Sequence, residues 1–492
     1  MYKRQERSYP RRVSARGNIS ARQDKTDIKA DKSLIITFGP VKNEKTDEIE
    51  IKPRRLEATG EVEITDRSGE QPTIARAETL ISNLLDKTAV LKGAPARIIQ
   101  KDKLGKENFI EGDEILLDGL QESASITGKG RLKFYSDTNI SGKKTTKPEP
   151  VQISWTKKMN YRGKEQTAVA VGNVHLATAD DELDCENLYV LFAGKEISAT
   201  KSPEKKPKAT TGTLAGPVYS KVGRISMVVA KGNARLRSYR KDKQGFLLQR
   251  VQLRSNHLLY QADKNILSCS GRGTLVAEDY RQPIDTGKNK PGTDDFFAGR
   301  IDRPSQSAFS WSKSMVLDWS GPKRMKTAQN ENTIITMVGD VRMAHRSGRQ
   351  IVMSEKLPIR RWKDLPAGRN ITLRCDRILV QFAPAQKATK PSKTPLQGIT
   401  IGPVDLFDAR GENVNLRDGP REVFCQRILY QRRNDVAIIW GSLPGKTPKK
   451  DAILYYQDEK KGVLNTWKSP KIIWFRKTNR IVTKSVESHG GW

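Results

Sequence analysis

The chain has 492 residues, of which 36% are hydrophobic, 7% aromatic and 29% charged. Its 89 Lys and Arg residues outnumber 56 Asp and Glu residues and give a net charge of +33, which attracts polyanions such as nucleic acid, anionic lipid or acidic polysaccharide. The charge is spread along the whole chain, which argues against a discrete nucleic-acid-binding module. No stretch reaches the roughly eighteen apolar residues that a membrane-spanning helix needs.

One short phrase recurs from the N-terminus onward: Gly, a polar residue, then apolar–polar–apolar. Apolar residues two positions apart, with a polar residue between them, predict a strand with one buried face. Gly followed by Asn or Asp favours a turn at the start of that strand. The phrase therefore predicts an all-β repeat array with almost no helix. Its six copies begin at Gly17, Gly60, Gly172, Gly232, Gly339 and Gly402.

A second phrase follows the first at variable distance, and the parity of its apolar residues changes at its centre. In the copy at 183–190, Leu183 and Cys185 share one parity, whereas Leu188 and Val190 share the other. A straight strand cannot bury both sets on one face, so we predict a bulge or a corner between them. Each unit is then two or three short strands that turn a corner. Further copies lie at 253–260, 352–359, 373–380, 423–430 and 467–474, with shorter ones at 77–80 and 112–115.

The repeats group into three predicted segments along the chain: 1–137 after a short basic tail, 150–284, and 306–487. Stretches rich in Lys, Pro and Thr are predicted to be loops between strands because they cannot bury surface. These stretches are 141–150, 200–212, 285–295 and 385–396. The start of the chain lacks the apolar core of an export signal, so we expect an export segment upstream of Met1. A cytoplasmic protein is the alternative.

The residues that most often carry chemistry fall into repeat slots. Cysteines at 185, 375 and 425 occupy a corner slot that small residues such as Ala77 and Ser255 fill elsewhere, so we expect them to pack as small core side chains. A disulfide between adjacent units is the alternative, and the wide spacing of the four cysteines does not favour a metal site. The recurrent acidic residue after the corner, as at Asp376, is expected to accept a hydrogen bond from a corner amide. We predict no catalytic residue, metal or cofactor.

At these two phrases the chain resembles the OstA-like family, the LptA, LptC and LptD periplasmic proteins of lipopolysaccharide transport. The most similar segment is 168–192; others are 230–236 with 253–273, and 337–348 with 373–382. The resemblance implies an open, V-shaped β-jellyroll, sometimes described as a β-taco solenoid, built of short antiparallel strands. It also implies lipid handling, a place in the periplasm or at the periphery of the outer membrane, and partners of similar fold. Open terminal edges favour docking onto such partners by strand addition.

A sheet with one apolar face forms a trough in which acyl chains lie against aliphatic side chains while a charged head group stays outside. Burial of each methylene contributes about 0.8 kcal/mol, which offsets the cost of removing the lipid from a membrane. We therefore predict a non-enzymatic envelope protein that binds lipopolysaccharide-like or other acyl lipids and bridges them towards the outer membrane. A structural β-solenoid scaffold without cargo and a polyanion- or polysaccharide-binding β-helix are the alternatives.

The predicted site has two parts, each taken from the repeat phrases. Arginines at polar positions are candidates for a rim that attracts head groups: Arg235, Arg342, Arg374 and Arg377. Apolar residues of the strands are candidates for the lipid lining: Val174, Leu176, Leu188, Val190, Phe192, Leu258, Tyr260, Ile378, Val380, Phe382, Ile428 and Tyr430.

Overall fold

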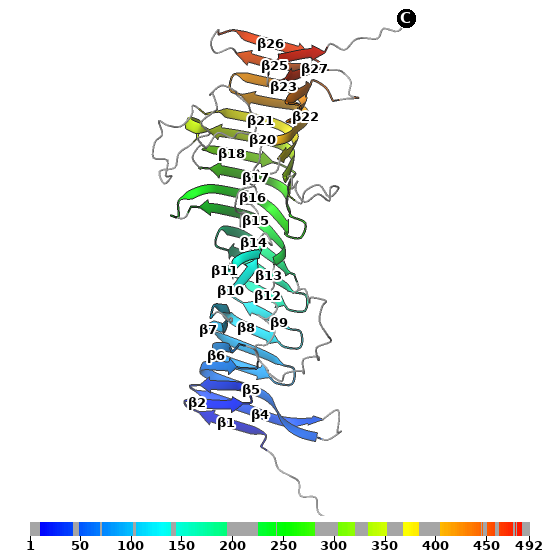
Figure 1. The fold of residues 1–492 in the computed structure, drawn as a ribbon. Helices are drawn as coiled ribbons and strands as arrows, with labels where there is room; N and C mark the ends of the chain where they lie inside the picture. The colour runs from blue at the N-terminus through cyan, green and yellow to red at the C-terminus, as the bar shows by residue number, and fades with distance from the viewer. Residues whose placement is uncertain are drawn as a thin grey trace, which may run out of the picture. The chain divides into compact units, whose positions relative to one another are not determined.

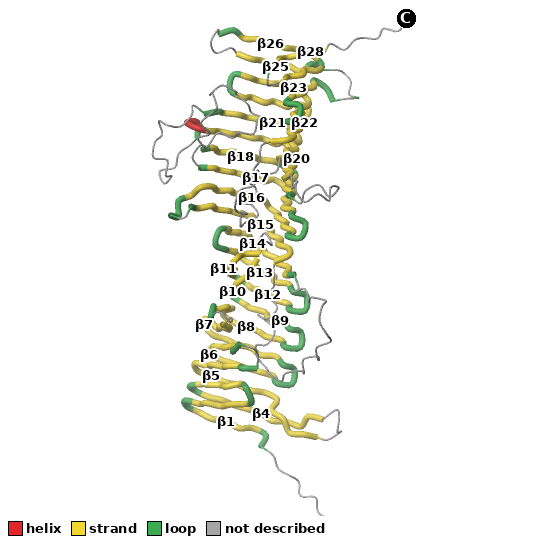
Figure 2. Tube along the Cα trace, in the orientation of Figure 1, coloured by secondary structure: helices red, strands yellow, loops and turns green. Residues whose placement is uncertain are grey.

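The structure is a computed structural model, and it describes most of the chain in sixteen stretches. These are 10–42, 49–68, 71–101, 105–138, 144–193, 225–242, 244–280, 304–319, 333–351, 368–382, 404–443, 445, 450–457, 462–475, 478 and 480–484. Within these stretches the chain forms 28 strands and one 3₁₀ turn at Gly348–Gln350. The predicted all-β array of antiparallel strands is confirmed, and strands account for nearly all regular structure in Figures 1 and 2.

The chain divides into two compact units: residues 1–179 with 184–228, and residues 180–183 with 229–492. The three segments expected from the repeats cut across this division and stay a prediction. Three of the predicted loops, 200–212, 285–295 and 385–396, and the phrase copy at 352–359 lie outside the described residues. Among the residues that are described, no helix is long and apolar enough to cross a membrane.

The first unit contains β1 to β13 and most of β14. Their bounds are β1 (Arg12–Arg16), β2 (Ile19–Gln23), β3 (Thr26–Ala30), β4 (Ser33–Lys42), β5 (Ile49–Asp66), β6 (Thr73–Asn83), β7 (Thr88–Lys101), β8 (Glu107–Asp118), β9 (Ser123–Thr127), β10 (Gly130–Thr138), β11 (Lys144–Trp155), β12 (Lys158–Arg162), β13 (Thr167–Ala177) and β14 (Asp181–Phe192).

The second unit contains most of β15 and all later strands. Their bounds are β15 (Ile225–Lys241), β16 (Leu247–Gln261), β17 (Ile266–Asp279), β18 (Ser305–Trp311), β19 (Ser314–Asp318), β20 (Thr333–Ser347), β21 (Asn370–Phe382), β22 (Val404–Asp418), β23 (Arg421–Gln431), β24 (Val436–Trp440), β25 (Ala452–Gln457), β26 (Leu464–Ser469), β27 (Lys471–Phe475) and β28 (Arg480–Lys484).

Each unit has two walls that share their long strands. In the first unit, the first half of β5 pairs with β4 and then β1, whereas its second half pairs with β3 and then β2. Farther along, β9 and β12 continue the first wall, and β10 and β11 continue the second. In the second unit β19 lies in the first wall and β18 in the second, and each pairs with both β17 and β20. Long strands therefore pass from one wall to the other.

The passage between walls is the predicted corner, where the strand register shifts. In β21 the inward residues are Leu373 and Cys375 before the corner, and Ile378 and Val380 after it. The register against β22 shifts between Arg374 and Arg377, and similar shifts occur along β5, β6, β7, β16 and β20. The prediction that a bulge separates the two apolar sets is confirmed.

The Gly–polar phrase supplies the left-handed backbone at these corners. Gly172 and Asn173 have φ values of 90° and 41°, and Gly339 and Asp340 have 88° and 37°. Two successive left-handed residues favour Gly followed by Asn or Asp, because other side chains are strained there. The dipeptide therefore fits the corner where the phrase occurs, whereas the corner of β21 between Arg374 and Arg377 is made without a left-handed residue.

One predicted loop is wrong. The Lys-, Thr- and Pro-rich stretch 141–150 was expected to connect strands, but β11 begins at Lys144 within it. Pro150 and Glu149 stand opposite Tyr135 and Ser136 of β10, so the backbone is already in the sheet there. The pairing with β10 overrides a composition that is unfavourable for strands.

Candidate functional site

The two walls of each unit enclose an apolar lining, and all twelve predicted lining residues lie on it. Val174 and Leu176 are on the second wall and the other ten on the first, and none is more than 8% exposed. The twelve candidates are thus buried strand residues, and their role in lipid binding stays a prediction. Because these side chains are covered by the protein itself, they do not mark the part of the lining that a guest could reach first.

In the first unit the interior is closed across the walls. Phe134 of β10 and Phe192 of β14 make an edge-to-face contact with ring centroids 6.1 Å apart. Leu132 and Phe134 stand opposite Ile153 and Val151 of β11, and all four are buried. Large side chains from both walls thus fill the space between them at this level.

The second unit repeats the same arrangement with smaller side chains at two of the four positions. Leu275 of β17 stands opposite Phe309 of β18, as Leu132 stands opposite Ile153 in the first unit. Ala277 stands opposite Ser307, as Phe134 stands opposite Val151. Ala277 therefore occupies the place of Phe134, and Ser307 that of Val151. All four residues of the second unit are partly exposed. The inner lining is open to solvent here, next to Val251 of β16, which is also partly exposed.

The two repeat phrases do not predict this part of the lining, but another pair of sequence motifs does. Gly128-Lys129-Gly130-Arg131-Leu132 and Gly271-Arg272-Gly273-Thr274-Leu275 are two copies of one motif, and each is followed by a Ser-Trp pair at Trp155 or Trp311. In both units that Trp stands opposite the second Gly of the motif. Aligning the two copies pairs Phe134 with Ala277 directly.

A polar cluster borders the open lining of the second unit. His345 of β20 is buried, and its Nδ1 lies 2.7 Å from the Ser307 hydroxyl on β18. Burial, together with the nearby Arg369 guanidinium, lowers the pKa of His345 to about 4. Arg369 donates a hydrogen bond of 2.6 Å to Asp418 of β22. The imidazole is therefore neutral at pH 7, and the cluster keeps the adjacent interior polar without an unpaired charge.

The four candidate head-group arginines occupy exposed positions of their strands. Arg235, Arg342 and Arg374 alternate with buried residues of their strands and are exposed, so they project from the outer faces close to the corner. Arg377 is exposed just after the corner of β21. The period of two places these polar residues outward wherever their neighbours point inward, and their role in attracting head groups stays a prediction.

Two of these arginines share a carboxylate at the corner. Arg342 Nη2 lies 2.9 Å from Asp340, and Arg374 Nε lies 3.5 Å from the other oxygen of the same group. The hydrogen bond from Arg342 lowers the pKa of Asp340, which is thus ionised. One carboxylate serves two guanidinium groups, so this outer surface keeps excess positive charge.

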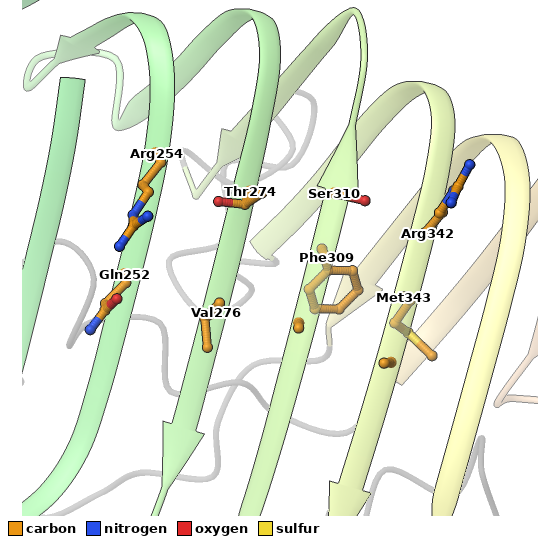
Figure 3. Close-up of a pocket in the computed structure, with 10 residues that line it drawn as sticks. Gln252, Arg254, Thr274, Val276, Phe309, Ser310, Arg342 and Met343 are labelled. Atoms are coloured by element: carbon orange, nitrogen blue, oxygen red, sulfur yellow. The ribbon is translucent and has the colours of Figure 1, made fainter. Parts of the chain in front are cut away.

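A shallow groove of about 450 Å³ lies mainly over the outer face of β16, β17, β18 and β20, and Phe309 and Met343, which have the parity of the inner face, also border it. Arg254 and Arg342 stand at its two sides, and small residues form most of its floor (Figure 3). In register, Arg254 faces Thr274, Thr274 faces Ser310, and Ser310 faces Arg342. The lining consists of Gln252, Arg254, Thr274, Val276, Ala308, Phe309, Ser310, Arg342, Met343 and Ala344.

The cysteines and the corner carboxylate behave as structural groups. All four cysteines are free and buried, so the alternative of a disulfide is not found. Burial raises the pKa of Cys185, Cys269 and Cys375 to about 12. Asp376 accepts a hydrogen bond of 3.0 Å from the amide of Glu412, as expected for the corner position. Within the described stretches no group of His, Cys, Asp or Glu side chains could hold a metal ion.

The fold and the lining define a class of two-walled antiparallel β-arrays with an apolar interior. Residues 3–123, within the first unit, match the family model described as the LptA/(LptD N-terminal domain) LPS transport protein. This match confirms the resemblance to the OstA-like family for that part of the chain. No curated protein matches the sequence.

Proposed function

We propose that the protein is a non-enzymatic carrier that holds the acyl chains of lipopolysaccharide or a similar anionic lipid against its inner lining in the cell envelope. The proposal is supported by the family match of residues 3–123 and by one structural observation. That observation is the partly exposed apolar surface of Val251, Leu275, Ala277 and Phe309 between the walls of the second unit.

Physical chemistry favours a guest at this surface. Solvent-exposed Leu and Phe side chains gain about 25 cal/mol for each Å² that a hydrocarbon tail covers. Within the second unit, the guest would continue along the lining formed by the seven predicted residues of that unit: Leu258, Tyr260, Ile378, Val380, Phe382, Ile428 and Tyr430. Those positions are covered in this structure, so passage of a lipid requires the walls to separate.

The basic outer surface supplies the attraction to head groups. Arg235, Arg342, Arg374 and Arg377 lie outside the lining, and an exposed ion pair at any one of them contributes little. Together with the net charge of +33 they raise the local concentration of an anionic lipid. We propose that they guide the lipid to the array rather than hold its phosphate in a fixed site.

Edge strands provide the proposed route between proteins. Strand addition at the open ends of the array would extend the lining into a partner of similar fold. A place in the periplasm or at the periphery of the outer membrane follows from this role. Because a carrier of this kind has no energy source of its own, the direction of movement is set by partners.

Photo-crosslinking tests the proposal at neighbouring positions of one strand. A photoreactive phenylalanine is placed at Leu275, which faces inward, or at Val276, which faces outward. The protein is exported in a Gram-negative host and irradiated in cells. We expect a crosslink to a phosphate-containing lipid from 275 and none from 276. Equal labelling at both positions, or none at 275, would exclude a lipid-binding interior.

The cargo-free scaffold remains a second candidate for the first unit. The contact between Phe134 and Phe192 closes that interior with the protein's own side chains. A photoreactive residue at Leu132 distinguishes the two candidates for that unit. A lipid crosslink there would show that the first unit also opens, whereas its absence together with labelling at 275 would assign the cargo to the second unit.

A further inference from the structure

The outer face of the first wall is continuously apolar over β23, β24, β27 and β28 of the second unit. One row of outward residues can be followed in register from β16 to β28. From β16 to β22 a polar residue interrupts this row at every second strand: Ser268, Thr336 and Asp408. From β23 onward four apolar residues follow one another: Leu429, Ile438, Ile473 and Val482. All four are partly exposed, so this part of the row is an apolar surface towards solvent.

Other short strands of the first wall carry polar residues at the same places. Ser125 of β9 stands opposite Asn160 of β12, and the Ser125 hydroxyl donates a hydrogen bond of 2.8 Å to the Asn160 side chain. Each is the middle residue of its strand, as are Ile438 of β24 and Ile473 of β27, which also stand opposite each other. The fold therefore accepts polar residues at these places, and strand pairing does not require the two isoleucines.

Aromatic rings with cations beside them border this apolar row on both sides. The Arg427 guanidinium lies 4.9 Å and the Lys471 ammonium 5.7 Å from the centre of the Trp440 ring. On the other side, the Arg480 guanidinium lies 5.9 Å from the centre of the Phe475 ring, which belongs to a residue that is 38% exposed. In register, Trp440 stands between Arg427 and Lys471, and Phe475 stands opposite Arg480. Each ring thus has positive charge beside it at the border of the apolar surface.

Nearby carboxylates do not balance the positive charge of this surface. Arg427 lies 3.0 Å from Asp408, but Arg410 shares the same carboxylate at 2.5 Å. Lys471 and Arg480 have no acidic partner among the described residues. The strands β24, β27 and β28 contain no acidic residue within their bounds. A ligand for this surface must therefore combine hydrocarbon with negative charge.

An anionic membrane surface offers this combination over the whole area of the row. Strands lie about 4.8 Å apart, so four of them present a face about 14 Å wide. Aliphatic side chains favour the acyl boundary of a membrane, Trp favours its interface, and the long side chains of Lys and Arg reach the phosphates. A protein partner is normally fixed by about ten hydrogen bonds. The outward side chains of β24 are Val436, Ile438 and Trp440, whose only polar group is the indole.

We propose that the outer face of β23, β24, β27 and β28 lies on an anionic phospholipid membrane. Ile438, Ile473 and Phe475 are at the acyl boundary, and Lys471 and Arg480 are at the phosphates. The proposal rests on the proposed place of the protein in the cell envelope and adds a membrane-binding face to it. It does not depend on a lipid between the walls, because the wall itself separates its outer face from the interior.

Vesicle binding of the full chain tests the apolar part of this face. The protein is sedimented with phosphatidylcholine vesicles that contain phosphatidylglycerol, at physiological salt, where the diffuse attraction of the net charge is screened. The double variant Ile438→Ser/Ile473→Asn places the residue types of β9 and β12 on β24 and β27. Its partition coefficient is expected to fall at least about tenfold, because binding scales with the apolar area that enters the membrane. Undiminished binding would overturn the proposal.

A matched control removes apolar area from the same wall outside this face. Leu259→Ser/Val316→Asn changes two outward apolar residues of β16 and β19, and its partition coefficient is expected to match that of the wild type. An equal loss in both double variants would contradict the assignment of membrane binding to this face. Circular dichroism checks that both variants fold.

A fluorescent probe identifies what covers the face without removing it. An environment-sensitive dye is attached to Ile473→Cys or to Val316→Cys, since the four native thiols are buried. The anionic vesicles should shift the emission to the blue at 473 but not at 316, and lipids with a nitroxide on the acyl chain should quench it. A blue shift without vesicles that grows with protein concentration would show that a second copy covers the face. That result, or the absence of quenching, would overturn the proposal.

Charge reversal tests the anionic part of the ligand. Lys471→Glu/Arg480→Glu is expected to remove the preference for vesicles with phosphatidylglycerol over pure phosphatidylcholine, because these cations lie at the membrane surface. Arg254→Glu/Arg417→Glu changes the net charge equally at two exposed arginines elsewhere in the second unit and should retain most of the preference. An equal loss in the two variants would assign the attraction to the net charge and overturn the proposal.

Lipopolysaccharide crosslinking reports separately on the proposed carrier function. The purified wild type and Ile438→Ser/Ile473→Asn, each with a photoreactive phenylalanine at Leu275, are expected to crosslink added lipopolysaccharide equally. Loss of vesicle binding with retained crosslinking would support the membrane-binding face. Vesicle binding without any crosslinking would overturn the carrier function and leave the membrane-binding face supported.

Discussion

The level of β10 and β11 in the first unit and the level of β17 and β18 in the second unit share a register but differ in what fills them. Phe134 and Val151 close the first, whereas Ala277 and Ser307 leave Leu275 and Phe309 of the second partly exposed. Both levels keep a buried Trp opposite a Gly at the corner. The backbone pairing is therefore the same in both units, and the side chains between the walls decide whether the interior is filled or open.

The strongest test of this contrast removes the aromatic contact of the first unit. Phe134→Ala is expected to lower the free energy of unfolding by about 3–5 kcal/mol, because a buried Phe loses its contacts and leaves a cavity. Urea denaturation followed by tryptophan fluorescence measures the change. Ala277→Gly, at the equivalent place in the second unit, serves as the control and should have a much smaller effect. Equal losses would show that the two levels are packed alike.

The polar cluster of the second unit predicts a pH dependence of the free energy of unfolding. His345 titrates at about 4 in the folded state, against about 6.5 in an unfolded chain. The unfolded state therefore binds the proton first as the pH falls, so stability is complete above about pH 6.5 and is lost towards pH 4. The loss is on the order of 3 kcal/mol at most. His345→Gln should flatten this part of the profile in urea melts. An unchanged slope would contradict the buried neutral imidazole.

The shared corner predicts equal effects in both units. A Cβ added at Gly130 or Gly273 would clash with the ring of Trp155 or Trp311 on the neighbouring strand. Gly130→Ala and Gly273→Ala should each cost about 1–3 kcal/mol through overpacking. Thermal melts of the two variants measure this, with the outward neighbours Ser154→Ala and Ser310→Ala as controls. A loss at one Gly alone would show that the corners are not equivalent.

The smallest expected effect concerns the thiols. Cys185, Cys269, Cys375 and Cys425 are buried, and burial raises the pKa of each thiol. A thiolate is the reactive form, so a disulfide reagent should modify the native protein slowly at pH 8 and react with all four thiols in denaturant. Rapid reaction of any thiol in the native protein would indicate that its corner opens.

The repeat phrases predicted the strands, the corners and the inner face, because each depends on alternation and on local backbone preference. Leu373, Cys375, Ile378 and Val380 show this most clearly, since their change of parity alone located the corner of β21. Pairing between strands decided the features that the phrases did not predict. The stretch at 144–150 joined β10 despite its composition.

Accessibility of the lining could not be predicted one strand at a time. Whether Leu275 and Phe309 are covered depends on Ala277 and Ser307 beside them and on the side chains of the opposite wall. The sequence contains this information only when 128–132 and 271–275 are compared as two copies of one motif. The carrier proposal thus depends on a difference between copies and not on the repeat itself.

Ala277→Phe gives the most direct test of the central claim that the second unit holds an open apolar lining for lipid. It places a Phe where the first unit has Phe134, while a photoreactive phenylalanine at Phe309 reports on the guest. We predict that lipid crosslinking at 309 falls at least about tenfold, with the fold retained and Ala308→Phe on the outer face without effect. Undiminished crosslinking in Ala277→Phe would contradict the account.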